Sequence, residues 1–300
     1  MKTATKINQG KTYAMDALAF DLKRLTKSDR TGSRQTQADR ARMAQAMAQD
    51  LKNSGFRLPS AKSLKPKHIE RLVRDWQKQG ISTGVLKNRM STLRWWAKSI
   101  NKASVVHRTN DAYGIERRST SDVNKGQRLN LDKVAKLPCA RMQLAVRMAA
   151  AFGLRIEEAL KFQPRLADKG DKIALKPSWT KGGRYREIPV LTDRHRALLN
   201  EVRDTVGDAS LIPDEKTYIE HRKAFEYQTL KAGMTNLHGL RHNYAQWRYK
   251  ALTGLRCPKD GGEATKRLSA ADKQADRDAR LTIAEELGHS RLDVTKAYLG

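Results

Sequence analysis

The sequence predicts a mainly α-helical protein of two domains, with one small β-hairpin in the second domain. Three observations support this fold class. Apolar residues recur at helical spacing through most of the chain. Two short segments, 172–177 and 185–190, instead have the character of strands and lie on either side of a glycine pair. The length of 300 residues is more than one small core usually fills, which favours two domains.

The chain from Tyr13 to about Ile100 has a helical pattern throughout. Gly80 is expected to end one of these helices, and Ser82 or Thr83 to cap the next. Three apolar sets mark successive helices, and these are Ala41, Met43, Ala44, Met47, Ala48 and Leu51; then Ile69, Leu72, Val73 and Trp76; then Leu86, Met90, Leu93, Ala97 and Ile100. The first hundred residues are therefore expected to be all-helical.

The polar faces of these helices are strongly basic and lie close in sequence to Trp76, Trp95 and Trp96. For any single basic residue, a solvated face over an aromatic core remains an equal alternative to phosphate contact. The one-sided sign favours phosphate contact for the whole set. Its members are Lys65, Lys67, Arg71, Arg74, Lys78, Lys87, Arg89, Arg94 and Lys98.

A polar stretch over residues 101–128 has little apolar periodicity and predicts a connection between domains. We place a helical domain at 1–110, the linker at 111–128 and the second domain at 129–300. The second domain is expected to open with helices around Leu131–Leu137 and Arg141–Phe152. Its strands follow, with Gly182-Gly183 able to adopt positive φ between them, and helices resume after Thr192. Residues 253–273, polar and charged, predict an exposed loop.

The charge balance points to a polyanionic partner. Lys and Arg number 60 against 32 Asp and Glu, a formal net charge of +28 that is spread along the whole chain. A membrane is disfavoured, because the longest apolar stretch, Leu144–Leu154, is short and broken by Arg147. The N-terminal residues lack a signal-peptide core, so we expect a cytoplasmic protein. Cys139 and Cys257 lie far apart and predict neither a disulfide framework nor a thiolate metal site.

Two motifs carry arginines suited to binding a phosphate. Arg155 lies in GLRIEEAL with Glu158 one helical turn later, and an ordinary intrahelical ion pair is the alternative interpretation. His238 and Arg241, three residues apart in HGLRHNYAQW, share one face of a helix expected to begin near Leu237. Both side chains could then reach one phosphate.

The last motif, LGHSRLDVTKAYLG, places His289 nine residues before Tyr298. A packing aromatic is the alternative to a nucleophile here. A phenol with an ordinary pKa of about 10 needs cationic neighbours to attack efficiently, and the two arginines and two histidines could provide them. A metal bound by His238 and His242 with His289 is a further alternative, disfavoured because no HExxH pattern accompanies them.

Taken in order, GLRxxE, a hairpin lysine, HxxR, and LGH with a tyrosine nine residues on resemble the catalytic signature of the tyrosine recombinase, or phage integrase, family. The resemblance covers about residues 130–300. The basic helical first domain also resembles the core-binding domain with which that family closes around DNA. The resemblance therefore implies a helical core-binding domain followed by a tyrosine-recombinase catalytic domain.

The resemblance further implies a role for each motif residue. Tyr298 would attack the scissile phosphate and become a 3′-phosphotyrosine. Arg155 and Arg241 would bind the non-bridging oxygens with help from His289, while His238 would assist proton transfer at the nucleophile. Strand exchange of this kind would need no cofactor, because each phosphotyrosine conserves the energy of the bond it replaces.

The hairpin lysine is Lys181, which the resemblance implies protonates the 5′-hydroxyl leaving group. Lys172, Lys176 and Arg184 lie in or near the same hairpin and are alternatives. Glu158 would be a support, able to steady Arg155, and not a reactant.

The expected partner is double-stranded DNA, bound by a homotetramer in the synaptic complex, with accessory DNA-bending or directionality factors and no membrane. Such a protein would act at the nucleoid of a bacterium or on phage DNA. The integrase of a mobile element is favoured over a chromosome-dimer resolvase, and both share the same chemistry.

Three features depart from the family pattern. Two residues follow Tyr298, where relatives commonly continue into a segment that docks on a neighbouring protomer; the stretch between HxxR and LGH is longer than expected; and Ala159 replaces a bulkier apolar residue. The main alternative function is a DNA-binding protein of recombinase architecture that does not cut. An RNA-binding protein is less favoured, because no aromatic-rich RNA-binding segment is present.

Overall fold

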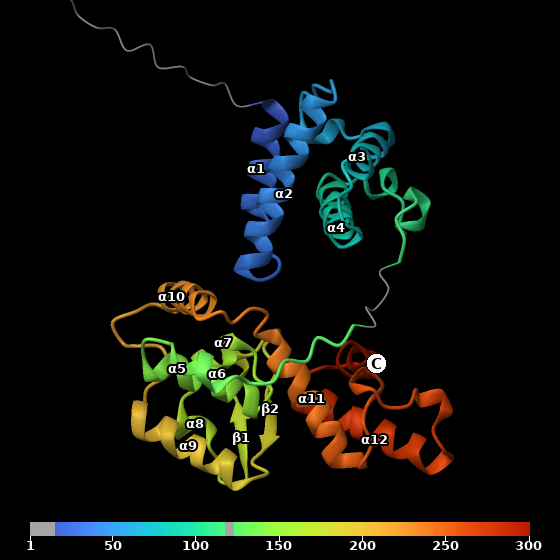
Figure 1. Ribbon diagram of the computed structural model, residues 1–300. Coiled ribbons are helices and arrows are strands. Elements are labelled where there is room, and N and C mark those ends of the chain that lie inside the picture. Colours follow the sequence, from blue (N-terminus) through green and yellow to red (C-terminus); the bar gives the residue numbers. More distant parts are fainter. Residues whose placement is uncertain (1–15, 118–122) are drawn as a thin grey trace, which may run out of the picture. The chain divides into compact units, whose positions relative to one another are not determined.

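The computed structural model describes residues 16–117 and 123–300 of the chain (Figure 1). The expected helical start at Tyr13 and part of the proposed linker, residues 118–122, lie outside these ranges. The chain divides into two compact units, residues 1–119 and 120–300, and each has its own hydrophobic core. Both units are mainly helical, and the strands within the described ranges form one two-stranded sheet. The predicted fold class is confirmed.

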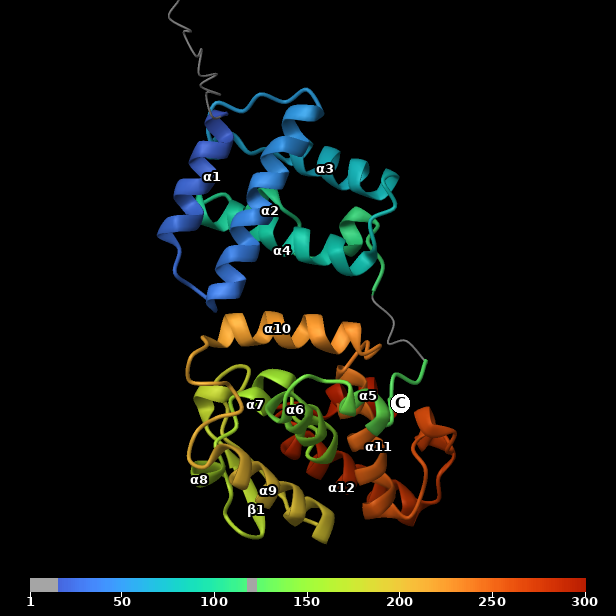
Figure 2. The same cartoon turned by 60° about the vertical axis from the view of Figure 1, so that its left-hand side comes forward.

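Four α-helices build the described part of the first unit. They are α1 (Ala17–Ser28), α2 (Arg34–Asn53), α3 (Pro66–Lys78) and α4 (Thr83–Ser99). Helix α1 lies along α2, and α3 and α4 also pack on α2 (Figures 1 and 2). Side chains cap the first two helices: Asp16 Oδ1 accepts a hydrogen bond from the Leu18 amide at 2.9 Å, and Ser33 Oγ accepts one from the Thr36 amide at 3.2 Å. Ser82 takes the N-cap position of α4, as predicted, but its side chain makes no capping bond. The apolar sets predicted for α3 and α4 are buried throughout.

The basic residues of this unit divide into two groups. Trp76 is fully buried and donates to Asp50 at 2.8 Å. Arg89 stacks on the Trp76 ring at 4.8 Å and lies 3.5 Å from Asp50, so it belongs to the packed interior. The residues that remain exposed are Lys65, Lys67, Arg71, Arg74, Lys78 and Lys98. Arg71 pairs with Asp75 at 2.8 Å, and all six side chains lie where a polyanion could reach them.

Helix α6 is the centre of the second unit, packed against α5, α7, α9 and α11. Helix α11 also contacts α12 and α13 (Figure 1). The helices of this unit are α5 (Leu131–Ala135), α6 (Ala140–Ala151), α7 (Ile156–Leu160), α8 (Pro164–Ala167), α9 (Asp193–Val206), α10 (Tyr218–Lys231), α11 (His238–Thr253), α12 (Ala270–Glu286) and α13 (Lys296–Leu299). Throughout the described ranges, every helix lacks the combined length and apolar character that crossing a membrane requires.

The two strands are β1 (Lys172–Leu175) and β2 (Arg186–Pro189), which pair antiparallel. They are shorter than predicted, because Pro177 begins a 3₁₀ turn that buries Trp179 in the core. Gly182 and Gly183 both have positive φ, as expected for the connection. A ten-residue connection thus joins the strands.

Residues 253–273 were predicted to form an exposed loop, and this prediction was wrong in part. Cys257 is fully buried in the core of the unit, and Leu268 is 9% exposed. Two short 3₁₀ turns, Pro258–Asp260 and Thr265–Arg267, interrupt the segment, and α12 already begins at Ala270. The first of these turns packs against α13. The stretch is therefore a support for the end of the chain.

Candidate active site

Four segments carry the candidate residues of the second unit. Arg155 precedes α7, which contains Glu158; His238 and Arg241 lie in the first turn of α11; His289 follows α12; and Tyr298 lies in α13. Gly153, with a φ of +59°, turns the chain between α6 and α7. An added Cβ there would lie 2.5 Å from Tyr244, so only glycine fits.

The carboxylate of Glu158 joins three arginines. Its side chain is fully buried and accepts hydrogen bonds from both the backbone amide and the guanidinium of Arg155, each at 2.7 Å. Arg186 donates two further bonds to it, at 2.9 and 2.6 Å, and Arg241 Nη1 lies 3.9 Å away. Burial alone would raise the pKa of Glu158, but the bonds and charge of Arg186, with the charges of Arg155 and Arg241, lower it to about 2. Glu158 is therefore ionised and supports more than Arg155 alone.

Arg186 was missed in the sequence analysis. It is 5% exposed and points inward from β2, on the same face as Ile188, while Glu187 between them is exposed. The alternation of inward and outward residues along β2 could have predicted this, because an arginine at an inward strand position needs a buried partner. Arg186 also packs on the turn before His289: a Cβ added to Gly288 would lie 3.1 Å from its side chain.

Arg241 is held by backbone carbonyls. It is 1% exposed, and its guanidinium donates to Gly153 O at 2.5 Å and to Leu287 O. It thereby ties α11 to the turn before α7 and to the end of α12. Burial lowers its pKa to about 10, so the group is still cationic at neutral pH. Its Nε is buried without a hydrogen-bond partner among the described residues.

Tyr298 lies among three histidines and is 5% exposed. Its hydroxyl is 3.2 Å from His289 Nε2. The ring centroids of His242, His289 and His238 lie 4.5, 5.5 and 6.1 Å from that of Tyr298. Of the two histidines named in the sequence analysis, His289 is thus the one within hydrogen-bond distance of the phenol.

The histidines around Tyr298 lie in a positive field. Burial, then the charges of Arg241 and Arg155, lower the pKa of His238, and the same causes lower that of His289 to about 4. Burial and neighbouring basic groups likewise lower the pKa of His242 to about 4. All three rings are therefore neutral at pH 7.

Three long side chains hold backbone carbonyls of α13 and of Gly300, which follows it. Gln246 Nε2 donates to Tyr298 O at 3.1 Å, Lys259 Nζ to Ala297 O at 2.7 Å, and Arg280 Nη1 to Gly300 O at 2.8 Å. A helix of four residues has little stability of its own. These donors therefore fix where the Tyr298 side chain lies.

Lys181 stands apart from this cluster. It is exposed, and none of the contacts found in the described ranges joins it to the other candidates. Two of its alternatives are already engaged: Lys172 pairs with Glu187 at 2.9 Å, and Lys176 lies over the Trp179 ring at 5.1 Å. The assignment of Lys181 stays a prediction.

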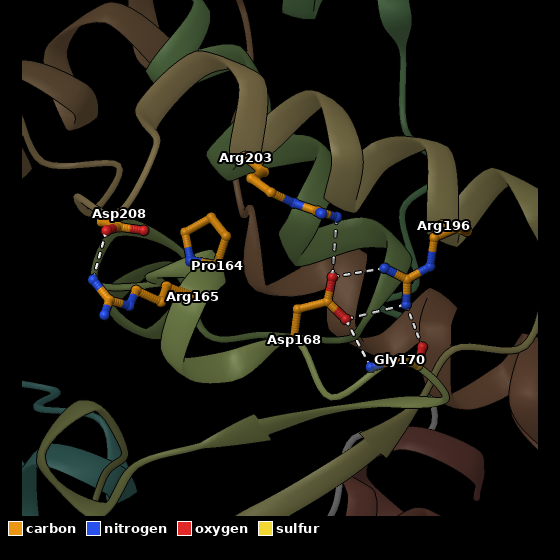
Figure 3. A pocket seen from close by; sticks show the side chains of 7 residues that line it. All are labelled: Pro164, Arg165, Asp168, Gly170, Arg196, Arg203 and Asp208. Carbon is orange, nitrogen blue, oxygen red and sulfur yellow. Dashed lines mark hydrogen bonds and ion pairs between the residues drawn. The ribbon is translucent and has the colours of Figure 1, made fainter.

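Apart from the arginine cluster around Glu158, an arginine-lined pocket of about 420 Å³ lies between α8 and α9 (Figure 3). Its cations are paired: Arg196 grips Asp168 with two bonds, Arg203 lies 3.5 Å from the same carboxylate, and Arg165 contacts Asp208 at 2.7 Å. This pairing marks a structural network. Elsewhere in the described ranges, no group of three or more His, Cys, Asp or Glu side chains is arranged to hold a metal ion.

Replacing Glu158 by Gln is expected to lower the free energy of unfolding of the second unit by about 3–5 kcal/mol, because it leaves three buried or half-buried arginines without their anion. Glu201→Gln is the matched control, since Glu201 also binds one arginine, Arg147, with two bonds but on the surface. It should cost less than about 1 kcal/mol. Denaturant unfolding measures both, and equal losses would contradict the role given to Glu158.

Stability should fall as the pH drops from about 6.5 to about 4. An unfolded histidine takes up a proton near pH 6.5, whereas folded His242 and His289 do so only near pH 4. Between these values the unfolded state binds more protons, so acid favours unfolding. Glu158 adds its own loss at lower pH, below about 4.5. Unfolding free energies measured across pH 4–7 test this, and His242→Asn should reduce the slope.

Two family models match the chain. That of the N-terminal part of phage integrases matches residues 15–106, and the integrase model matches residues 131–247. Together they cover more than half of the chain, including Arg155, Glu158 and Arg241 but neither His289 nor Tyr298. No curated protein sequence matches the chain.

Solved structures share the fold. A lambda integrase dimer bound to a core site is 16% identical with a TM-score of 0.60, covering 94% of this chain and 95% of that one. The XerH recombinase in a post-cleavage complex is 19% identical with a TM-score of 0.59, covering 94% and 81%. The Tn1549 transposon integrase with circular-intermediate DNA is 13% identical with a TM-score of 0.57, covering 93% and 95%. With the two family models, this fold shows that the chain belongs to the phage integrase family of tyrosine recombinases.

Proposed function

We propose that this protein is a site-specific DNA recombinase that cleaves and rejoins DNA through a covalent bond to Tyr298. Membership of the integrase family supports recombination of DNA as the activity. The observation that carries the finer assignment is the Tyr298 hydroxyl, 3.2 Å from a neutral His289 and surrounded by the field of Arg155 and Arg241. A phenol beside a proton acceptor and two phosphate-binding cations is equipped to attack a phosphodiester.

In the proposed reaction, the Tyr298 oxygen attacks the scissile phosphorus as the phenol proton passes to His289 Nε2. The bond from phosphorus to the 5′ oxygen breaks, which leaves a 3′-phosphotyrosine. Arg155 and Arg241 stabilise the charge that builds on the non-bridging oxygens. Lys181 donates the proton that the departing 5′ oxygen requires. Rejoining is the reverse, with another 5′-hydroxyl as the attacking group.

This assignment exchanges two roles relative to the family resemblance, in which His238 assists proton transfer and His289 helps the arginines. The ring centroids of His289 and His238 lie 5.5 and 6.1 Å from that of Tyr298. The choice of His289 as the proton acceptor rests on the distance of 3.2 Å between its Nε2 and the phenol oxygen. We assign His238 to the phosphate side of the site, where it lies one helical turn from Arg241.

Each exchange replaces one phosphodiester by one phosphotyrosine and back, so no ATP is required. The arginines supply the cationic charge that a divalent metal provides in other phosphoryl-transfer sites. A homotetramer on two duplexes is the proposed assembly. Supporting it, a lambda integrase tetramer bound to a Holliday junction shares this fold, at 17% identity and a TM-score of 0.56, covering 90% of this chain and 76% of that one.

Replacing Tyr298 by Phe should abolish covalent capture of DNA while DNA affinity changes less than about twofold, because only the nucleophilic oxygen is lost. The measurement is an SDS-resistant protein–DNA adduct formed in EDTA with DNA from the protein's native genomic neighbourhood. Tyr227→Phe, at an exposed tyrosine of α10, is the matched control and should react normally. Tight binding without any wild-type adduct on its own target would support the non-cutting alternative.

DNA binding should weaken steeply with salt. The net charge of +28 and the exposed lysines and arginines of the first unit imply release of many counterions on binding. A protein that neutralises six or more phosphates should show a log–log slope of about −5 or steeper between 50 and 200 mM salt. Titration of labelled duplex across that range measures it, and a flat response would refute the phosphate-facing role of the basic set.

A further inference from the structure

The segment Asn124–Gln127 packs along the first turns of α11, the helix that carries Arg241. The Gln127 amide donates to Gly239 O at 2.9 Å. A Cβ added to Gly239 would lie 2.7 Å from Lys125 O, so the two backbones approach as closely as glycine permits. This segment lies within the region predicted as a linker and is the part of the chain that enters the second unit.

The side chain of Gln246 connects this segment to the nucleophile. Gln246 is 6% exposed, and its Nε2 donates to Asn124 Oδ1 at 2.8 Å and to the carbonyl of Tyr298 at 3.1 Å. Asn124 Oδ1 also accepts from the Gly126 amide at 2.8 Å. A Cβ on Gly126 would lie 2.6 Å from Gln246 Oε1, so the segment closes over the amide.

The amide of Gln246 has two Nε2 hydrogens, and both are used in this arrangement. Asn124 takes one of them, which sets the rotation of the amide plane and aims the other at Tyr298 O. Without Asn124, a buried donor would lose its partner and the amide would be free to turn. Because α13 depends on side-chain donors for its position, that turn would displace the phenol.

We propose that Asn124 is a positioning residue for Tyr298, acting through Gln246, so that the entering segment must be seated for the nucleophile to be in place. The proposal rests on the proposed function of Tyr298.

The test uses the full-length protein and single-turnover cleavage at saturating DNA. Asn124→Ala should reduce the cleavage rate by about tenfold or more, as small misplacements of reacting groups do. DNA affinity should be unchanged, and the thermal midpoint should fall by only a few degrees, because a single donor loses its partner. Asn124→Asp keeps both acceptor contacts and should restore most of the rate. Asn53→Ala, which removes an exposed asparagine that accepts one side-chain bond in α2, is the matched control and should react like wild type.

A second variant changes the fit of the segment without altering a hydrogen-bonding side chain, and it has its own control. Gly126→Ala places a methyl against Gln246 and should slow cleavage, whereas Gly84→Ala in α4 adds the same methyl in open space and should not. In a Gln246→Ala background, Asn124→Ala should cause no further loss, because both act on one contact.

The outcomes separate the two proposals. If wild type forms no adduct on its located target, the function of Tyr298 is wrong. If wild type reacts and Asn124→Ala reacts equally fast, the positioning role is overturned while the function stands. Loss of rate in Asn124→Ala together with a larger fall of the thermal midpoint, and no rescue by Asp, would also overturn it, since that pattern indicates general packing.

Discussion

The buried carboxylate of Glu158 is the contact on which the cationic side of the site depends. Three arginines from different elements, Arg155, Arg186 and Arg241, lie within 4 Å of it. Burying such cations close together is unfavourable without an anion among them, because each loses water and repels the others. Glu158 removes that obstacle and at the same time fixes the relative positions of α7, β2 and α11. The positive centre is thus assembled before any substrate arrives.

One carboxylate does not neutralise three guanidinium groups. The surplus positive charge helps keep His238 and His289 unprotonated, since it contributes to the lowered pKa of each. A phosphodiester entering the site would supply the missing negative charge. In the proposed function, the same surplus of positive charge would bind the phosphate, stabilise the charge that builds on it, and keep the histidine beside the phenol neutral.

Much of this organisation could be predicted from sequence where the signal is local. The apolar stripes of α3 and α4, the turn at Gly182-Gly183 and the start of α11 at His238 follow from short-range spacing. The role of Arg186 was not predicted, because it depends on the strand register that places this side chain beside Glu158, 28 residues earlier in the sequence. The contact of residues 253–273 with the end of the chain was not predicted either. A polar sequence does not indicate that Cys257 fills a core position, or that Lys259 reaches the carbonyl of Ala297.

Tyr298, the proposed nucleophile, is positioned by a different principle from the arginines. Arg155 and Arg241 are held through their own side chains, by a carboxylate and by carbonyl oxygens. Tyr298 is held through the backbone of its short helix, by donors from α11, α12 and the segment after Thr253. These contacts hold the backbone of α13 and leave the phenol hydroxyl of Tyr298 without a constraint of its own from them. If Tyr298 acts as proposed, a change in one of these donors would move the reacting oxygen without weakening the arginine cluster. Cleavage could then be controlled separately from DNA binding.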